Sequence, residues 1–175
     1  LPGLSTTILV VADPRGRTMP PAALDRAMTL ARVELAPPHR APHPAAAAAG
    51  TALSVGLSLL ADALLARAGT LVFPGTRGYV HFQFADYAKL TVIGVIIAAL
   101  AWPVVVRLTA DPRWVYARLA VLVTAVLLLP DLYIWLTGQP GRAVLVLVAM
   151  HLAIALITYQ VMVRVAPPRP ARPGA

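Results

Sequence analysis

The chain has 175 residues, of which 59% are apolar and only 13% charged, and its mean hydropathy is +0.75. A soluble domain of this length usually carries about a quarter charged residues. One small core cannot enclose so many apolar side chains, so the composition indicates a membrane protein. The chain has no cysteine, which excludes disulfide bonds, thiolate catalysis and cysteine-based metal or iron–sulfur ligation.

The net charge of +8 does not indicate a nucleic-acid partner. Every basic residue except Lys89 is arginine, and alanine and proline are abundant, a pattern typical of high-GC coding bias. Basic residues in a chain this apolar are better explained by membrane orientation and by attraction to anionic headgroups. We therefore expect membrane lipids as partners and no nucleic acid.

The first 44 residues form a separate N-terminal segment. Between Pro21 and Leu35, a proline suited to the first helical turn precedes Leu24, Met28 and Ala31 at helical spacing. This pattern predicts an amphipathic helix over residues 21–35, lying on the membrane or on a partner; a loosely ordered tail is the alternative. Residues 36–44 read as a proline-rich linker.

Four segments are long enough to cross a membrane. A hydrocarbon core about 30 Å thick needs roughly 20 apolar residues in a helix, and helix satisfies every backbone amide within one segment. The expected spans are residues 45–65, 87–106, 114–136 and 143–163. The sequence thus predicts an all-α membrane protein, a four-transmembrane-helix bundle over residues 45–165, followed by a disordered basic tail at 166–175.

The basic residues predict the orientation of the bundle. Arg67, Arg77, Lys89 and Arg142 fall on the side of the first and third loops, and all other basic residues fall on the side of the two termini. The excess of positive charge places both termini in the cytoplasm of a bacterial cell, with the bundle in the plasma membrane. Trp102, Trp114 and Tyr116 are expected at the inner interface.

The outer loop between the first two spans has one apolar side. Pro74-Gly75 indicates a turn, and Val80, Phe82 and Phe84 alternate with polar or less apolar residues. We expect a short extended or hairpin loop, which either caps the bundle or docks a partner.

Small residues predict how the helices meet. Gly50, Ser54 and Ser58 recur every four residues in the first span, a spacing that lets membrane helices approach closely. The third span is mostly leucine and valine, so it is expected to face lipid or a foreign helix. The candidate partner contacts are therefore Val80, Phe82, Phe84, Leu127 and Leu128.

Ionisable residues within the spans are candidates for function, because a charge at the membrane centre costs about 2.5–3.5 kcal/mol on insertion scales. Asp62, Lys89 and Asp131 fall near the predicted outer ends. They are expected to form structural pairs, Asp62 with Lys89 and Asp131 with Arg142, or to line an ion or substrate vestibule.

His151 lies about 12 Å into the last span at 1.5 Å per residue. At that depth it needs a partner such as Ser54, Ser58, Thr124 or a carbonyl freed near Pro130. It is expected either to be a neutral packing residue or to take part in a proton relay. A metal role is the weakest reading, since a metal needs several converging ligands and the spans contain this one histidine.

Motifs for catalysis are missing. The sequence contains no nucleophile elbow, P-loop, dinucleotide fingerprint or acidic metal motif. We expect no enzymatic activity, no metal and no cofactor.

Two stretches carry a resemblance to a family. From about residue 45 onward, with the basic junction RLTADPRWVYARLA at 107–120 and VLVAMHLAIA at 146–155, the chain resembles small four-helix integral membrane proteins of high-GC Gram-positive bacteria. In size and topology it is also similar to the accessory four-helix subunit of Mce-type lipid importers. The resemblance implies a fold and a supporting role, but no reaction.

The leading hypothesis is a non-catalytic accessory subunit that stabilises a larger cell-envelope complex, such as the permease of an ABC-type lipid importer. The alternative is a small proton-coupled or solute transporter that acts as a homo-oligomer through Asp62, Asp131 and His151. A sensor with a cytoplasmic output segment at residues 21–35 is a third option.

Overall fold

A computed structural model describes residues 25–26, 28–29 and 39–170 of the chain, which divides into two units, 1–34 and 35–175. In the first unit the described residues Asp25, Arg26, Met28 and Thr29 are helical, and the Thr29 hydroxyl donates to the Asp25 carbonyl at 2.7 Å. The rest of the predicted amphipathic helix at 21–35, and residues 171–175 of the predicted tail, lie outside the described residues.

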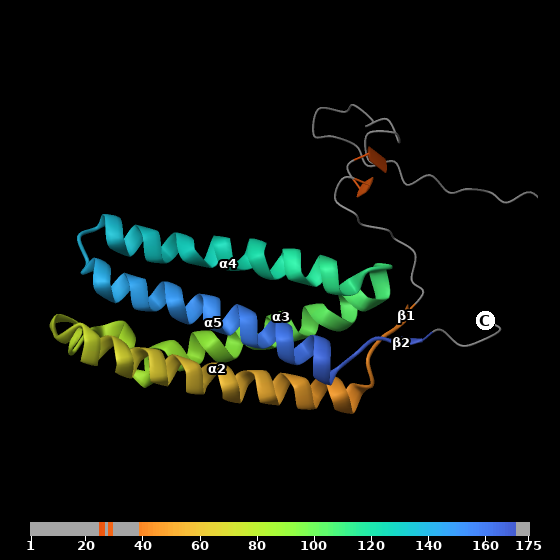
Figure 1. Ribbon diagram of the computed structural model, residues 1–175, viewed down its shortest axis with the longest axis horizontal. Helices are drawn as coiled ribbons and strands as arrows, with labels where there is room; N and C mark the ends of the chain where they lie inside the picture. The colour runs from red at the N-terminus through yellow and green to blue at the C-terminus, as the bar shows by residue number, and fades with distance from the viewer. Residues whose placement is uncertain (1–24, 27, 30–38, 171–175) are drawn as a thin grey trace, which may run out of the picture. The chain divides into compact units, whose positions relative to one another are not determined.

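The second unit is built from four helices, α2 (Pro44–Val72), α3 (Phe84–Leu108), α4 (Pro112–Leu136) and α5 (Gly141–Val165) (Figure 1). All four are long and apolar enough to cross a membrane. The prediction of an all-α four-helix membrane protein is confirmed. The main difference in bounds is at the end of α2, which continues seven residues beyond the predicted position 65, because a helix can keep its backbone hydrogen bonds past the apolar stretch.

The helices begin where the sequence supplies caps. Asp111 precedes Pro112, and its carboxylate accepts the Trp114 amide at 3.3 Å. His43 precedes Pro44 at the start of α2, and its Nδ1 accepts the Ala45 amide at 3.3 Å. In both cases proline stands in the first turn, where its missing N–H costs no hydrogen bond.

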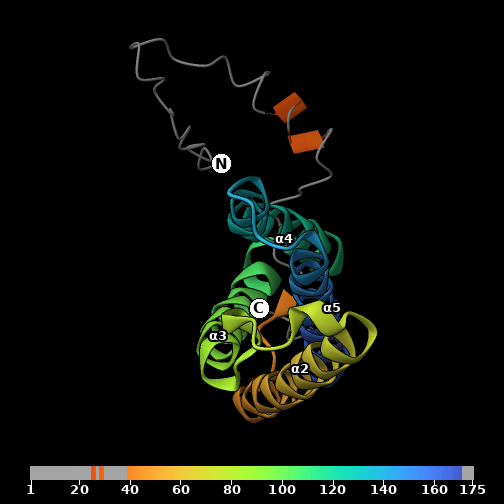
Figure 2. The same cartoon turned by 90° about the vertical axis from the view of Figure 1, so that its left-hand side faces the viewer.

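The four helices pack around a common interior. Viewed along the helices, α2 lies between α3 and α5, and α4 lies on the opposite side of the bundle (Figure 2). The contact between α2 and α5 is the most extensive of all, and α4 rests mainly on α5. Because α2 and α5 run antiparallel, the start of one lies beside the end of the other.

Two short strands tie the ends of the bundle together. β1 (His39–Arg40) pairs antiparallel with β2 (Arg169–Pro170), and the Arg169 guanidinium donates to the Ala41 carbonyl at 2.7 Å. The expectation of a disordered tail from residue 166 is therefore wrong up to Pro170, because pairing with the linker satisfies its backbone. We call this end of the bundle the terminal end and the opposite one, with residues 73–83 and 137–140, the loop end.

The loop between α2 and α3 is not a hairpin. It forms two short 3-10 turns, η1 (Pro74–Thr76) and η2 (Val80–Phe82), joined at Gly78, whose φ is 81°. Its backbone bonds are local: the Thr76 amide donates to Phe73 at 2.9 Å and the Phe82 amide to Tyr79 at 3.0 Å. The alternating pattern misled the prediction because local turns satisfy this backbone without a second strand.

Apolar side chains form one cluster near each end of the interior. The terminal-end cluster is built around Trp102, Val106 and Met162, all fully buried, and the loop-end cluster around Tyr87, Leu147 and Met150. Trp102, which the sequence predicted to face the inner interface, is enclosed within the bundle and 0% exposed. Its indole N–H donates to the Ala166 carbonyl at 2.7 Å, so the core supplies the partner that a headgroup would otherwise give.

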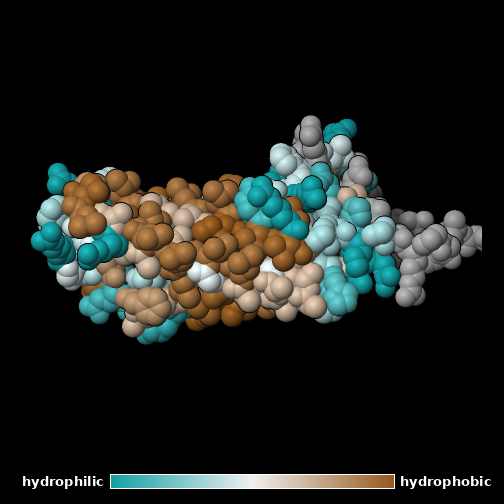
Figure 3. Space-filling model, turned by 60° about the horizontal axis from the view of Figure 1, so that its bottom comes forward, coloured by the Kyte–Doolittle hydropathy of each residue, from teal (hydrophilic) through white to brown (hydrophobic). Residues whose placement is uncertain are grey.

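The outside of the bundle is apolar. Figure 3 shows a wide hydrophobic band over the middle of the helices, with polar residues at the loop end and again toward the terminal end. Only 6% of the apolar window of α4 is buried within the chain, against 22% to 33% for the other three helices. The prediction that this span turns most of its surface outward is confirmed.

Two glycines of α2 provide a test of its packing on α5. A Cβ added at Gly69 would lie 2.7 Å from Cγ2 of Val146, whereas one added at Gly56 would meet nothing within 4 Å. Because Val146 is β-branched and stiff, we expect Gly69→Ala to lower the free energy of unfolding by about 1–3 kcal/mol. Gly56→Ala should raise it by up to about 1 kcal/mol through helix propensity.

The measurement is denaturant-induced unfolding of each variant in mixed micelles, followed by circular dichroism. Equal stability of the two alanine variants would contradict the close approach of α2 and α5.

Candidate functional site

A row of polar residues runs along the buried face of α2. Ser54, Ser58 and Asp62 follow one another every four residues, and each is 0% exposed. Residues at this spacing share one face of a helix. The same face carries Gly50 and Gly69, which lie against Met162 and Val146, so the polar row faces α5.

Asp62 is held by a single protein hydrogen bond from α3. The Thr91 hydroxyl donates to its Oδ2 at 2.6 Å, within the buried interior. The other carboxylate oxygen, Oδ1, is buried and has no hydrogen-bond partner among the described residues. A buried carboxylate normally accepts several hydrogen bonds, so Asp62 has an unused acceptor.

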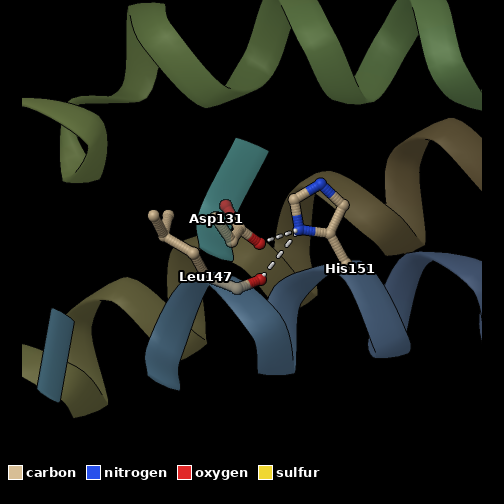
Figure 4. Close-up of polar contacts among 3 residues, drawn as sticks. All are labelled: Asp131, Leu147 and His151. Carbon is tan, nitrogen blue, oxygen red and sulfur yellow. Dashed lines mark hydrogen bonds and ion pairs between the residues drawn. The ribbon is translucent and has the colours of Figure 1, made fainter. Parts of the chain in front are cut away.

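Asp131 of α4 meets His151 of α5 (Figure 4). His151 Nδ1 lies 3.0 Å from Asp131 Oδ2 and also 3.0 Å from the Leu147 carbonyl oxygen. The side chain of Asp131 is 6% exposed and that of His151 29% exposed. Only the contact with Leu147 has the alignment of a hydrogen bond. Asp131 Oδ2 is close enough to His151 for an ion pair, but it accepts no hydrogen bond from the described residues.

This geometry fixes the tautomer of His151. A carbonyl oxygen can only accept, so Nδ1 must carry the hydrogen that points to Leu147. In the neutral ring Nε2 is then a lone-pair acceptor, and protonation at Nε2 makes the ring cationic beside Asp131. Nε2 is thus the ring nitrogen that is not engaged by the hydrogen bond to α5.

The Asp131–His151 contact and the Thr91–Asp62 hydrogen bond lie within electrostatic range of each other. His151 lies within electrostatic range of both Asp62 and Asp131. We call Asp62, Thr91, Asp131 and His151 the acid–imidazole cluster. All four helices contribute one member each, so the cluster forms only when the whole bundle is assembled.

The loop end closes over this cluster. Tyr79 packs there with its hydroxyl buried and without a partner among the described residues, and the charge of Asp131 reaches both Tyr79 and His81. Burial, and then the negative charge of Asp131, raise the pKa of Tyr79 above its usual value of 10.0. His81 also pairs with Asp86 at 3.4 Å, with both side chains partly exposed. Tyr79 and the partly exposed His81 are therefore the loop residues within electrostatic range of Asp131.

The cluster lacks a protein countercharge for one of its acids. It holds two carboxyl groups and one imidazole, and no lysine or arginine among the described residues is buried. Even with His151 protonated, one negative charge remains on the ionised acids. Charge in a low-dielectric interior is costly, so uptake of a further proton would lower the cost of burying this site.

Several sequence-predicted residues lie elsewhere. Lys89 is exposed, and the expected pairs Asp62–Lys89 and Asp131–Arg142 do not form: Asp62 accepts from Thr91 and Asp131 lies against His151. The reason is the rotation of the helices, which points the two acids inward and the two cations outward.

The predicted partner contacts divide into two groups. Val80, Phe84 and Leu127 are exposed, whereas Phe82 and Leu128 are only half-buried, with Phe82 packed on the loop-end cluster. Of the partners expected for His151, the structure provides a carbonyl, but it belongs to Leu147 one turn earlier on α5 and not to the region of Pro130.

Thr91 and Tyr79 were missed in the sequence. Thr91 could have been found, because it stands between Tyr87 and Val95 at helical spacing on the buried face of α3. Tyr79 gave no signal, since its position depends on how the loop folds.

Among the described residues, no group of three or more histidine, aspartate and glutamate side chains is placed to hold a metal ion.

Comparisons with protein-family models, curated proteins and solved structures found no match for this chain. The candidate site is therefore defined by its own geometry.

The bond from Thr91 to Asp62 can be tested directly. Thr91→Val keeps the shape of the side chain but removes the donor, leaving both oxygens of a buried carboxylate without a protein partner. We expect the free energy of unfolding to fall by about 1–3 kcal/mol, measured in mixed micelles by tryptophan fluorescence. Thr109→Val is the matched control, because the buried Thr109 hydroxyl bonds only to the Val105 carbonyl of its own helix. An equal loss in both variants would argue against a specific role for the Thr91 bond.

Proposed function

We propose that this protein is a small proton-coupled membrane carrier whose proton-binding site is the acid–imidazole cluster. The observation that carries the proposal is the enclosure of Asp62, Asp131 and His151 together inside four membrane-length helices, with no buried lysine or arginine beside them in the described part of the chain. Ionisable groups inside a membrane-spanning bundle are costly, and a proton pathway is one function that explains why a protein keeps them there.

The cluster can hold a variable number of protons. With His151 protonated at Nε2, the imidazolium balances Asp131, and one negative charge remains on Asp62. A second proton, taken up by the Asp62 carboxyl group, makes the cluster neutral. Because the neutral cluster is much cheaper to keep in an apolar interior, proton uptake and release can bias how tightly α4 and α5 close on α2 and α3.

The proton would enter from the loop end. His81 is partly exposed, and Tyr79 and His81 both lie within electrostatic range of Asp131. These residues provide titratable or hydroxyl groups between the surface and the cluster. The carrier would act as a homo-oligomer through the outward surface of α4.

Proton movement is tested in liposomes that contain the purified protein and an internal pH-sensitive dye. A potassium gradient with valinomycin sets the membrane potential, and the initial rate of internal pH change is recorded. We expect wild-type flux well above empty vesicles, and a drop of about tenfold or more in Asp62→Asn and His151→Gln, since each removes one titratable group.

Asp111→Asn is the matched control, because it removes an exposed acid while asparagine keeps the helix cap. Wild-type rates in both cluster variants, at equal protein incorporation, would overturn the proposal.

A second candidate function is an accessory subunit that stabilises a larger envelope complex, such as an Mce-type lipid importer. It is favoured by the surface of α4, of which only 6% of the apolar window is buried within the chain, and by the exposed Val80 and Phe84 at the loop end. Lipid alone could cover this surface, but it is also large enough to receive a partner helix.

Native mass spectrometry of the tagged protein, extracted in mild detergent, distinguishes the two candidates. The carrier predicts whole multiples of the 18.5 kDa chain, and the accessory subunit predicts a complex with additional, different masses. Free monomer alone would contradict both the homo-oligomer and the accessory role.

For the location, we propose a multi-pass protein of the bacterial plasma membrane with the terminal end in the cytoplasm. The positive charge near β1, β2 and the α3–α4 junction supports this orientation, since Arg40, Arg107, Arg113 and Arg169 all lie in those segments.

A further inference from the structure

We propose that Ser54, Ser58 and Thr158 bind a line of water molecules that extends the proton site from Asp62 toward the terminal end. This inference rests on the proposed function for the role of Asp62, but the water line itself is argued from the hydroxyl groups. On α2, Ser58 lies about one turn and Ser54 about two turns from Asp62.

The three hydroxyl groups are buried without protein partners. Ser54 and Ser58 are 0% exposed and Thr158 is 3% exposed, and none of the three hydroxyl oxygens has a hydrogen-bond partner among the described residues. Hydroxyls in helices often bond back to the carbonyl four residues earlier. Thr51 and Thr109 do so in this chain, at 2.8 and 3.0 Å.

An unpartnered buried hydroxyl is costly, and bound water is the usual way to satisfy it. Three of them in one region, together with the unused Oδ1 of Asp62, supply the two to four polar contacts that each ordered water needs. Each hydroxyl can both donate and accept, so the waters can connect to one another through them.

The register of α2 and α5 places these groups in one line. Gly50 lies against Met162, and Gly69 lies against Val146. Because the helices are antiparallel, moving four residues forward from Gly50 and four back from Met162 brings Ser54 level with Thr158. The same register brings Asp62 close to the level of His151.

The length of the line follows from helix geometry. From Ser54 to Asp62 there are eight residues, or about 12 Å at 1.5 Å per residue. At about 2.8 Å for each O–H···O step, roughly two or three water molecules, with the Ser58 hydroxyl between them, complete the connection. Chains of this kind let a proton move by successive transfers between neighbouring oxygens.

The line ends at an apolar barrier. Beyond Ser54, the side chain of Met162 packs against Gly50, and Trp102 and Val106 fill the interior. Met162, Trp102 and Val106 are all fully buried. A proton that reaches Ser54 and Thr158 can therefore go no further in this conformation. Passage to the terminal end requires the contact between Gly50 and Met162 to open.

The titratable groups facing this region come from every element around it. They are Asp62 on α2, Asp131 on α4, His151 on α5, Tyr87 on α3, which lies within electrostatic range of Asp62, and Tyr79 and His81 of the loop. These six groups lie toward the loop end of the serine row. On the terminal side, the rings of Tyr116 on α4 and Tyr159 on α5 stack at the terminal-end cluster, and the Tyr116 hydroxyl donates to the Ala98 carbonyl at 2.9 Å. The direction of proton entry is therefore from the loop end to the serines.

The absence of cysteine from the chain allows a clean test. Ser54→Cys and Ser58→Cys each introduce one thiol of nearly the same shape. The protein is placed in lipid nanodiscs and exposed to silver ions in chloride-free buffer. A silver ion replaces the thiol proton, and bound silver is measured by intact mass. The controls are Leu57→Cys and Leu60→Cys, which lie on the same helix but on its exposed apolar face.

We expect the two serine positions to react at least about tenfold faster than the leucine positions, because silver ions and thiolates require water. Circular dichroism and size-exclusion chromatography verify that each variant is folded. If neither Ser54→Cys nor Ser58→Cys reacts faster than Leu60→Cys in folded protein, the water line is overturned.

A flux measurement separates this inference from the proposed function. The double variant Ser54→Ala/Ser58→Ala should lower proton flux several-fold if the waters carry the proton. Reactive thiols with no wild-type flux would support the water line and overturn the carrier. Intact flux with unreactive thiols would support the carrier and overturn the water line.

Discussion

The close packing of α2 on α5 determines the rest of the structure. It depends on small side chains at four-residue spacing, since a Cβ at Gly69 would already collide with Val146, and one at Gly50 would press on Met162. In lipid, where no hydrophobic force drives helices together, such close approach is the main source of association. The face that provides it also carries Ser54, Ser58 and Asp62, so the packing that holds the bundle together is the packing that buries its polar groups.

The buried acids lower the stability of the bundle. Asp62 has one protein hydrogen bond, and Asp131 has an ion-pair contact with His151 but no aligned hydrogen bond. An apolar substitution at these places would save the cost of desolvation. For the proposed carrier, incomplete hydrogen bonding of the acids is useful, because a carboxylate that accepts its full set of hydrogen bonds is stabilised in its charged form and binds a proton less readily. The apolar clusters at the two ends supply the stability that the middle lacks.

The position of α4 gives it a different role from the other helices. It turns most of its surface outward, and its buried polar residues, Thr124 and Asp131, point to the interior. Asp131 links it to His151 of α5, so a change of charge at the cluster acts directly on the least buried helix. A helix of this kind can move against the other three, or can carry the contact with a second membrane protein. Both candidate functions use the same surface, and they differ in whether the interior is active.

The sequence by itself determined the number of membrane-length helices and which acids lie within them. Long apolar stretches in a chain with so few charges have one stable state in lipid, and Asp62, Asp131 and His151 stand out because few other residues in the spans can ionise. Only the tertiary structure decided which of them meet. Helix rotation turns Lys89 outward and Asp62 toward Thr91, places Trp102 in the core, and folds the loop into 3-10 turns. Such choices depend on contacts between segments far apart in the chain, and periodicity within a single segment carries no information about them.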